Sequence, residues 1–457
     1  MKKNLMNMKS LSAGSCLLAA LLANNALAQS QYFTSAVVNG GTYSWDAANW
    51  SVSGGTSSGP FASNWTPGDF ARFYGFAGDN VTVTVNAAES NTGLYLNSGS
   101  SSTVNINDAG NNTGSLSILP GTAVTQNGYS WLPQGFLTGG GNVIINAPIG
   151  GTGGIEEESG GGNLELLGNN TYTGGTLFSS SSTFVDYNNN NSFGATSSQI
   201  GFDGTTFSLL QNNGPSSVNI ANPVQVIGTT GVDFIGNGAT FSGSWYLGGG
   251  STTVNLRNNG VGTTVALSGV LSSTTGTVTY SGANGGKIIL GAVNTYTGPT
   301  VIGSSGDTAI TVQLGVANAL SSSTKVTLGG GTLNLGGFSH TMTGTTLAQT
   351  ASSVIDFTSG GASSVSFANS SAQTWTGTLD LANWTAGVST FQVGTDTTGL
   401  SSGQLGDIEF DNNPATLGSA YLLPDGVVVP EPSTLALGLL GGLGGLGMIW
   451  RSRSRKA

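Results

Sequence analysis

Short runs of alternating apolar and polar residues recur along most of the chain. Clear examples lie at 81–85, 103–106, 142–145, 253–256, 277–280, 325–328 and 332–335, and most of them are bounded by Gly, Asn or Ser. Such alternation is typical of a half-buried β-strand, and the steady short spacing is typical of a solenoid or a sandwich. No long stretch between the two ends keeps the i, i+3, i+4, i+7 pattern of a helix. The pattern predicts an all-β chain.

Internal repetition favours the solenoid. An alternating run at 163–168 leads into N-T-Y-T-G at 170–174, and a second at 287–291 leads into N-T-Y-T-G at 294–298. In this unit we expect Tyr to fill the interior, both Thr to face outward and Gly to form a corner, while Asn and Thr at corners form ladders along the stack. The block resembles the autotransporter-associated β-strand repeat, and this resemblance implies a right-handed parallel β-helix.

The C-terminal end holds three different segments in a fixed order. They are Pro430-Glu431-Pro432, an uncharged apolar run up to Trp450, and the basic residues Arg451, Arg453, Arg455 and Lys456. The run over 432–450 approaches the roughly 20 apolar residues that cross a bilayer core. Because cations are costly in hydrocarbon, the basic residues are expected to stay in the cytoplasm, with the body across the membrane. The pattern predicts one transmembrane helix at about 432–450.

These three segments resemble the PEP-CTERM sorting signal. The resemblance implies a Gram-negative bacterium, recognition by an exosortase-type membrane protease, removal of the tail, and delivery of the body to the cell surface or an exopolysaccharide matrix. It assigns sorting and processing recognition to Pro430, Glu431, Pro432, Arg451, Arg453 and Arg455. These residues are then recognised in a substrate, and none is catalytic. An anchored and a released surface protein are both compatible with this tail.

The N-terminal end has the layout of a secretory signal peptide. Lys2, Lys3 and Lys9 precede an apolar core at 17–22, and Ala26 and Ala28 provide small residues for cleavage by signal peptidase after Ala28. The only cysteine, Cys16, precedes most of the apolar run, so a lipoprotein site is not expected. Because Cys16 leaves with the signal peptide, disulfides and thiol chemistry are excluded from the exported body.

The exported body is strongly acidic. Between the two ends stand 20 acidic residues and only four basic ones, Arg72, Arg257, Lys287 and Lys325. Nucleic acid is therefore excluded as a partner, because binding it requires Lys and Arg to neutralise phosphates. An acidic surface suits a protein that stays soluble outside the cell.

Candidate catalytic and metal-binding residues are few. The only histidine, His340, follows a strand without a G-x-S-x-G context, and we interpret it as an ordinary surface or turn residue. No catalytic residue and no cofactor is predicted. Structural calcium is the remaining alternative, because 407–411 starts like a calcium loop, but Asn412 and Gly418 stand where that loop needs Gly and Glu. We interpret 407–411 as a half-buried strand, and the run 156–158 (Glu-Glu-Glu) as a solvated loop.

Aromatic residues cluster in the first exported segment, and we interpret Trp45, Trp50 and Trp65 as part of an end cap rather than a ligand site.

The sequence predicts the following segments of the chain: a signal peptide at 1–28, an N-terminal β cap and first coils at 29–150, a β-solenoid at 151–350 with repeats near 163–210 and 287–335, a closing β module at 351–411, a proline-broken linker at 412–429, and the sorting tail at 430–457 with its basic end at 451–456. Two functions are compatible with this organisation. The first is a non-enzymatic structural or adhesin-like surface protein of a biofilm or exopolysaccharide matrix; the second is a glycan-active β-helix enzyme, a lyase or hydrolase, with clustered carboxylates.

Overall fold

The computed structural model describes residues 30–431 with internal gaps. The gaps are 34–39, 52–63, 68, 75–79, 92–93, 98–102, 111–113, 120–123, 127–128, 132, 139–140, 158–162, 180–183, 204–206, 228–230, 249–252, 305, 307–308, 321–324 and 359–361. The expected signal peptide, with Ala26 and Ala28, and the tail from Pro432 onward lie outside the described residues. Among the residues that are described, no helix is long and apolar enough to cross a membrane.

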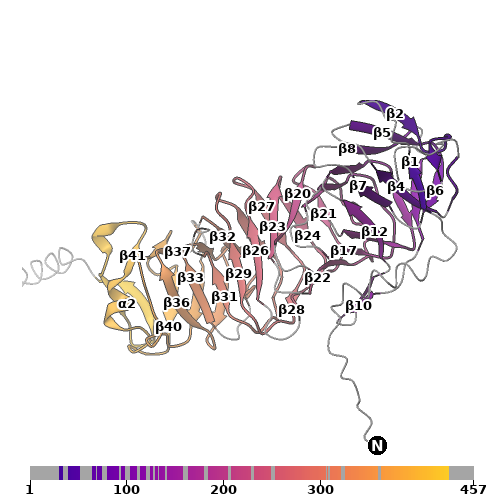
Figure 1. The fold of residues 1–457 in the computed structure, drawn as a ribbon. Helices are drawn as coiled ribbons and strands as arrows, with labels where there is room; N and C mark the ends of the chain where they lie inside the picture. The colour runs from indigo at the N-terminus through magenta and orange to yellow at the C-terminus, as the bar shows by residue number, and fades with distance from the viewer. Residues whose placement is uncertain are drawn as a thin grey trace, which may run out of the picture.

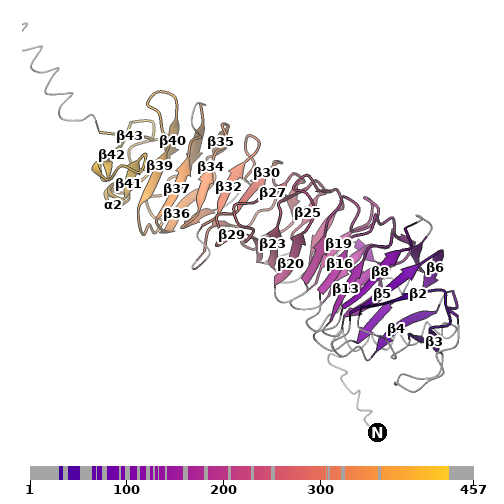
Figure 2. The same cartoon turned by 90° about the horizontal axis from the view of Figure 1, so that it is seen from above.

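Parallel strands stack coil upon coil into an elongated rod, with the indigo N-terminal strands at one end and the yellow C-terminal elements at the other (Figures 1 and 2). Three long sheets form most of its faces. Sheet 1 contains 13 strands: β2 (Gly41–Ser44), β5 (Asn80–Val85), β8 (Thr103–Asp108), β13 (Asn142–Ile145), β16 (Asn163–Leu166), β18 (Phe184–Tyr187), β20 (Phe207–Asn212), β23 (Gly231–Gly236), β26 (Val254–Asn258), β29 (Val278–Ser281), β31 (Thr300–Ile302), β33 (Lys325–Gly329) and β36 (Thr346–Ala351). Sheet 2 contains 11: β3 (Trp50–Ser51), β1 (Ser30–Phe33), β4 (Phe70–Tyr74), β7 (Leu94–Asn97), β12 (Pro133–Thr138), β15 (Gly154–Glu157), β17 (Thr176–Phe178), β19 (Ile200–Phe202), β22 (Val224–Val226), β25 (Trp245–Tyr246) and β28 (Leu271–Ser272). Sheet 3 contains nine: β21 (Asn219–Ile220), β24 (Ala239–Phe241), β27 (Thr264–Leu267), β30 (Lys287–Leu290), β32 (Thr311–Leu314), β34 (Thr332–Asn334), β37 (Ser353–Asp356), β39 (Leu379–Ala382) and β41 (Ile408–Phe410).

Smaller elements complete the two ends. Sheet 4 contains β6 (Ala88–Asn91), β9 (Ser115–Ile118) and β14 (Ile149–Gly151), and sheet 5 contains β35 (Ser339–Met342), β38 (Ser364–Phe367), β40 (Thr390–Val393), β43 (Val427–Pro430) and β42 (Ala420–Leu422). The hairpin of β10 (Val124–Gln126) and β11 (Tyr129–Trp131) is inserted in one coil, and the short helices α2 (Ser402–Gly406) and η1 (Pro414–Thr416) lie near the C-terminal end. The predicted all-β parallel solenoid is thus confirmed, while its handedness stays a prediction.

Coil length is nearly constant over most of the rod. From β13 to β36, successive strands of sheet 1 begin 21 to 25 residues apart. In-register pairing places Val83, Ile106, Ile145, Leu166 and Tyr187 in one column, and each is at most 1% exposed. Each apolar side chain buried in this way contributes about 1.5–3 kcal/mol. The apolar side chains of the alternating runs therefore form the interior of the solenoid.

Both N-T-Y-T-G units adopt the expected side-chain arrangement. Tyr172 and Tyr296 are fully buried, and each hydroxyl contacts the hydroxyl of the threonine four residues later, at 2.5 and 2.8 Å respectively. The threonines directly before and after each tyrosine are exposed. The glycine is required because neighbouring coils touch: a Cβ at Gly298 would lie 1.7 Å from the carbonyl oxygen of Gly276.

The asparagine of each unit contacts the terminal strand of a sheet. Asn170 is buried beside β14, and its Oδ1 accepts a hydrogen bond of 2.8 Å from the backbone N–H of Ile149, the first residue of that strand. The Oδ1 of Asn294 likewise accepts a hydrogen bond of 2.9 Å from the backbone N–H of Leu271, the first residue of β28. Since β14 and β28 are the last strands of sheets 4 and 2, each copy of the repeated unit lies where one of these two sheets ends.

Aromatic side chains fill the interior of the first coils. Trp45 and Trp50 are fully buried with ring centroids 5.0 Å apart, and Trp65 lies 4.7 Å from Trp50 and 5.2 Å from Trp45. Phe33 and Phe73 complete the cluster. These rings belong to the core of the first coils, and the expected N-terminal cap stays a prediction.

A carboxyl pair beside this cluster makes stability depend on pH. The pKa of Glu89 is raised from 4.5 to about 7, first by burial and then by a hydrogen bond and repulsion from Asp46. The folded state therefore binds this proton more tightly than the unfolded state. The resulting stabilisation is complete below pH 4.5 and is lost as the pH rises through about 7.

Replacing Glu89 with glutamine is expected to flatten the pH dependence of the free energy of unfolding between about pH 5 and pH 8, because the titrating group is gone. Urea unfolding at a series of pH values measures this. Asn105→Ala, which replaces a half-exposed uncharged residue of sheet 1, is the control and should leave the slope as it is because asparagine does not titrate. An unchanged slope in Glu89→Gln contradicts the assignment.

The C-terminal end of the solenoid is closed by an antiparallel hairpin. Strand β42 pairs with β43, and β43 also pairs with β40, the last parallel strand of sheet 5. The turn at 423–426 joins the two strands, with Gly426 at a φ of 81°. The stretch 412–429, expected to be a linker, contains η1, β42 and most of β43.

Candidate functional site

The first residues of the expected sorting site belong to the folded body. Pro430 is the last residue of β43 and lies opposite Ala420. The backbone N–H of Glu431 donates to the carbonyl oxygen of Ser419 at 2.5 Å, while its side chain is exposed. Pro432 and the three arginines assigned to the site lie outside the described residues. Of the residues assigned to the sorting site, the structure therefore describes only Pro430 and Glu431.

Val428 anchors this strand. It is fully buried, and it lies between Phe391 of β40 and Leu422 of β42. The pairing with β40 stops at Val428, and within the described residues the backbone of 429–431 pairs with β42 and Ser419 only. At the junction between body and tail, Val428 is therefore paired on both sides, and residues 429–431 are paired on one side.

The end of the rod that carries this junction is uniformly acidic. Residues 326–431 contain eight acidic residues and no Lys or Arg. On sheet 3, burial raises the pKa of Asp380 and the charges of Asp411 and Asp356 raise it further, while a hydrogen bond from the backbone of Asn412 lowers it. Burial and the nearby Asp380 raise the pKa of Glu409.

The calcium alternative gains no support from this acidic end. Within the described part of the chain, no group of three or more His, Cys, Asp or Glu side chains is placed to hold a metal ion. Ile408 and Phe410 of β41 are buried and Glu409 between them is half-buried, which agrees with the interpretation as a half-buried strand.

His340 is a buried residue of strand β35, so the expectation of an ordinary surface or turn residue is wrong. It is 2% exposed in β35, where Nδ1 accepts a hydrogen bond of 3.0 Å from the backbone of Asn318 and Nε2 lies 3.0 Å from the carbonyl oxygen of Leu335. Burial lowers its pKa, with the Leu335 contact opposing this. Both ring nitrogens are engaged by backbone, which leaves neither for a nucleophile.

The expected acidic loop is also wrong for its described part. Glu156 and Glu157 belong to β15 and are each 1% exposed, while Glu158 lies outside the described residues. Their backbones pair with β12 on one side and β17 on the other. Glu156 and Glu157 are buried because their strand pairs within the stack of coils. The run of charged residues in the sequence does not indicate this pairing.

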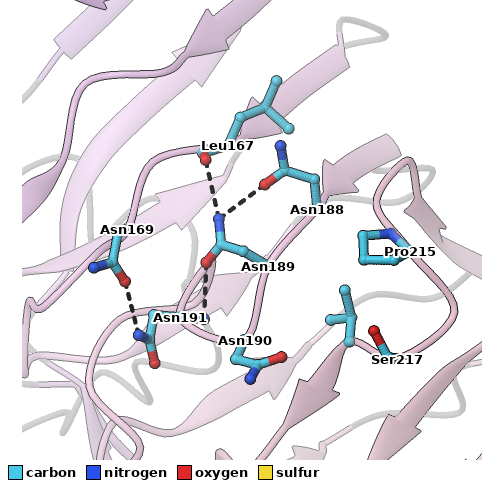
Figure 3. A pocket seen from close by; sticks show the side chains of 9 residues that line it. Leu167, Asn169, Asn188, Asn189, Asn190, Asn191, Pro215 and Ser217 are labelled. Carbon is cyan, nitrogen blue, oxygen red and sulfur yellow. Dashed lines mark hydrogen bonds between the residues drawn. The ribbon is translucent and has the colours of Figure 1, made fainter.

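A polar hollow opens on the rod where sheet 4 has ended and sheet 3 has not begun. It has a volume of about 590 Å³ and lies between β14 and the start of β21 along this face. Figure 3 shows the asparagines that surround it. The lining residues are Leu167, Asn169, Asn188, Asn189, Asn190, Asn191, Pro215, Ser217 and Val218. No charged residue is among them.

The asparagines of the hollow divide into two roles. Asn189 shapes the backbone, because its amide donates to the carbonyls of Leu167 and Gly168 at 3.0 and 3.1 Å. The Oδ1 of Asn169 accepts a hydrogen bond of 2.7 Å from the amide of Asn191, and Asn169 is exposed. The exposed amides thus present donors and acceptors without net charge. A second hollow of about 740 Å³ adjoins the first at Pro215 and is lined by small and uncharged residues.

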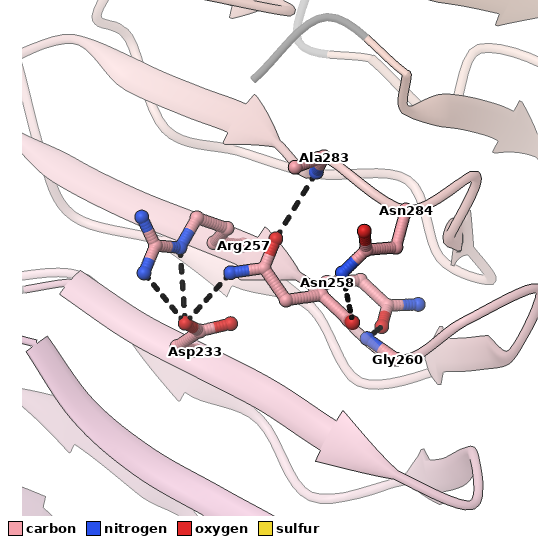
Figure 4. Close-up of polar contacts among 7 residues, drawn as sticks. Asp233, Arg257, Asn258, Gly260, Ala283 and Asn284 are labelled. Atoms are coloured by element: carbon pink, nitrogen blue, oxygen red, sulfur yellow. Dashed lines mark hydrogen bonds and ion pairs between the residues drawn. The ribbon is translucent and has the colours of Figure 1, made fainter. Parts of the chain in front are cut away.

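One ion pair lies on sheet 1, beyond the hollow (Figure 4). Nε and Nη2 of Arg257 donate to Oδ2 of the buried Asp233 at 3.0 and 2.7 Å, and Asn259 donates to the same oxygen at 2.9 Å. The register places Asp233 directly opposite Arg257 on adjacent strands. This contact links coils and uses one of the few cations of the body for structure.

A pair of carboxylates on adjacent strands of sheet 1 is a candidate for the clustered carboxylates of an enzymatic site. Glu165 and Asp186 lie opposite one another on β16 and β18. Burial raises the pKa of both, and repulsion from Asp186 raises that of Glu165 further. Neither residue lines either hollow. The two carboxylates therefore lie on a strand face outside both hollows.

Residues 428–456 match the PEP-CTERM protein-sorting motif. This confirms the sorting motif expected at the C-terminus, and it implies export, membrane anchoring through the tail and processing by an exosortase. The match begins inside β43. Neither the curated proteins nor the solved structures contain a match to the chain. The resemblance of the N-T-Y-T-G blocks to autotransporter-associated repeats stays a prediction.

Proposed function

We propose that the chain is a non-enzymatic surface protein of a Gram-negative bacterium, which acts as a spacer or adhesin in an exopolysaccharide matrix. A signal peptide at 1–28 would start export, and an exosortase would read the tail through Pro430, Glu431, Pro432 and the arginines. The observation that carries the proposal is the sorting motif at the end of a parallel solenoid. A rigid rod joined at one end to a membrane tail holds its far end away from the membrane.

The surface chemistry supports contact with uncharged polymers. The body has 20 acidic and four basic residues, which disfavours acidic polymers by repulsion. The asparagine hollow, in contrast, offers amide donors and acceptors without charge, and these match sugar hydroxyls. We therefore assign the adhesive contact to the hollow and to neutral polysaccharide.

Replacing both Asn169 and Asn188 with alanine is expected to weaken binding to neutral polysaccharide about tenfold, because two or three hydrogen bonds of about 0.5–1.5 kcal/mol each are lost. Asn189 is kept because it holds the backbone. The measurement is a binding titration of the mature protein against the neutral polysaccharide dextran and against the cell's own exopolysaccharide.

The matched control replaces Asn105 and Asn255, two half-exposed asparagines of sheet 1 outside the hollow, and should bind as the parent does. Equal weakening by both double variants, or none by Asn169→Ala with Asn188→Ala, contradicts the assignment to the hollow. Release of reducing sugar or unsaturated product during the titration would instead favour the enzymatic alternative, with Glu165 and Asp186 as its carboxylates.

A further inference from the structure

We propose that strand β43 gates processing: the sorting enzyme can act on the tail only after residues 429–431 separate from β42. This inference rests on the proposed sorting function. The proposal is based on the position of the sorting motif, which begins inside β43, the last strand of the folded body. No spacer separates the motif from the folded body.

The contacts define what must open. Val429 lies opposite Tyr421, Pro430 lies opposite Ala420, and the N–H of Glu431 donates to Ser419. A protease binds its substrate as an extended segment in its own cleft, so a backbone that is paired within a sheet has to be released first. Cleavage then follows the population of the open form when opening and closing are fast.

The same contacts limit how far the opening extends. Val428 is fully buried and is paired on both sides, with β40 and with β42. Beyond Val428, one neighbouring strand and the Ser419 carbonyl hold the chain. Release of 429–431 therefore breaks few contacts and leaves the solenoid end closed, which makes Ser419 and Tyr421 positioning residues for the sorting reaction.

A disulfide between β42 and β43 tests the gate. Tyr421 and Val429 are half-exposed direct partners on antiparallel strands, where Cα atoms lie about 4.5–5.5 Å apart, within the range that a disulfide spans. In Tyr421→Cys with Val429→Cys, the chain's single native cysteine, Cys16, lies in the expected signal peptide and does not compete. The unprocessed full chain, purified from cells that lack the enzyme, is mixed with exosortase after treatment with oxidised glutathione or with dithiothreitol.

We expect the oxidised variant to be processed at least tenfold more slowly than its reduced form, and the reduced form to match the parent chain. Insertion of Gly-Ser-Gly-Ser between Val429 and Pro430 moves the motif out of the sheet, and it should restore processing in the oxidised variant. Equal rates for the oxidised and reduced forms overturn the gate, as does a slow oxidised form that the spacer does not rescue. Failure of the parent chain to be processed at all overturns the sorting function and the gate with it.

Discussion

Replacing Asn170 with alanine is expected to lower the free energy of unfolding by about 2–5 kcal/mol, because two buried backbone groups lose their partners. The Oδ1 of Asn170 accepts from the N–H of Ile149 in the preceding coil, and its Nδ2 donates to the carbonyl of Ser192 in the following coil, both at 2.8 Å. The side chain is 1% exposed, so water cannot readily replace it. One amide thus joins three successive coils.

Its exposed neighbour provides the matched control. Asn169→Ala removes the same side chain one residue earlier and should change the free energy of unfolding by less than about 0.5 kcal/mol. Urea unfolding measures both variants, and hydrogen exchange shows where the loss falls, since a solenoid transmits stability between neighbouring coils. Equal effects of the two variants contradict the role assigned to Asn170.

The second N-T-Y-T-G unit allows the same test at an independent site. Asn294 accepts from Leu271 at 2.9 Å and donates to Ala319 at 2.8 Å. Asn294→Ala should therefore cost a similar amount, with increased exchange confined to the coils around β28. The two units lie far apart along the rod, so their effects are expected to add.

Much of this fold is visible in the sequence, because alternation and repetition are local properties. The runs at 81–85 and 103–106 predict β5 and β8, and the repeated unit predicts two buried tyrosines. The burial of the asparagine in that unit is not predicted, because it depends on a sheet ending beside it. The burial of Glu156 and Glu157 is not predicted either, because it results from pairing with β12 and β17 of the neighbouring coils. His340 is buried where its ring contacts the backbone of Asn318 and Leu335.

The prolines near the end of the body lie within folded elements. From the sequence, the prolines at 414, 424 and 430 predict a linker, since proline cannot donate in a sheet. In the structure, Pro414 begins η1, Pro424 lies in the hairpin turn and Pro430 ends β43. The sequence Leu423-Pro424-Asp425-Gly426 between two short apolar runs is a turn signal, and it could have identified the hairpin. The sorting tail itself is recognised from sequence alone.

Loss of tail processing is the second large effect that we expect. In cells without the exosortase, the chain should keep residues 432–457 and remain in the membrane fraction, because a charge-free run of this length holds a protein in a bilayer. In cells with the enzyme, the body should leave that fraction. A chain that stops after Glu431 keeps β43 and Glu431, and it should be exported without anchoring in both kinds of cell.

The most direct test of the account is the intact mass of the chain recovered from matched cells with and without the exosortase. When the enzyme is present, we predict a C-terminus between residues 430 and 456, so that part of the tail has been removed. When it is absent, we predict the complete tail ending at Ala457, and in both cases the N-terminus follows Ala28. A complete tail in both kinds of cell, or a chain that stays in the cytoplasm with its first 28 residues attached, would contradict the account of an exported and sorted surface solenoid.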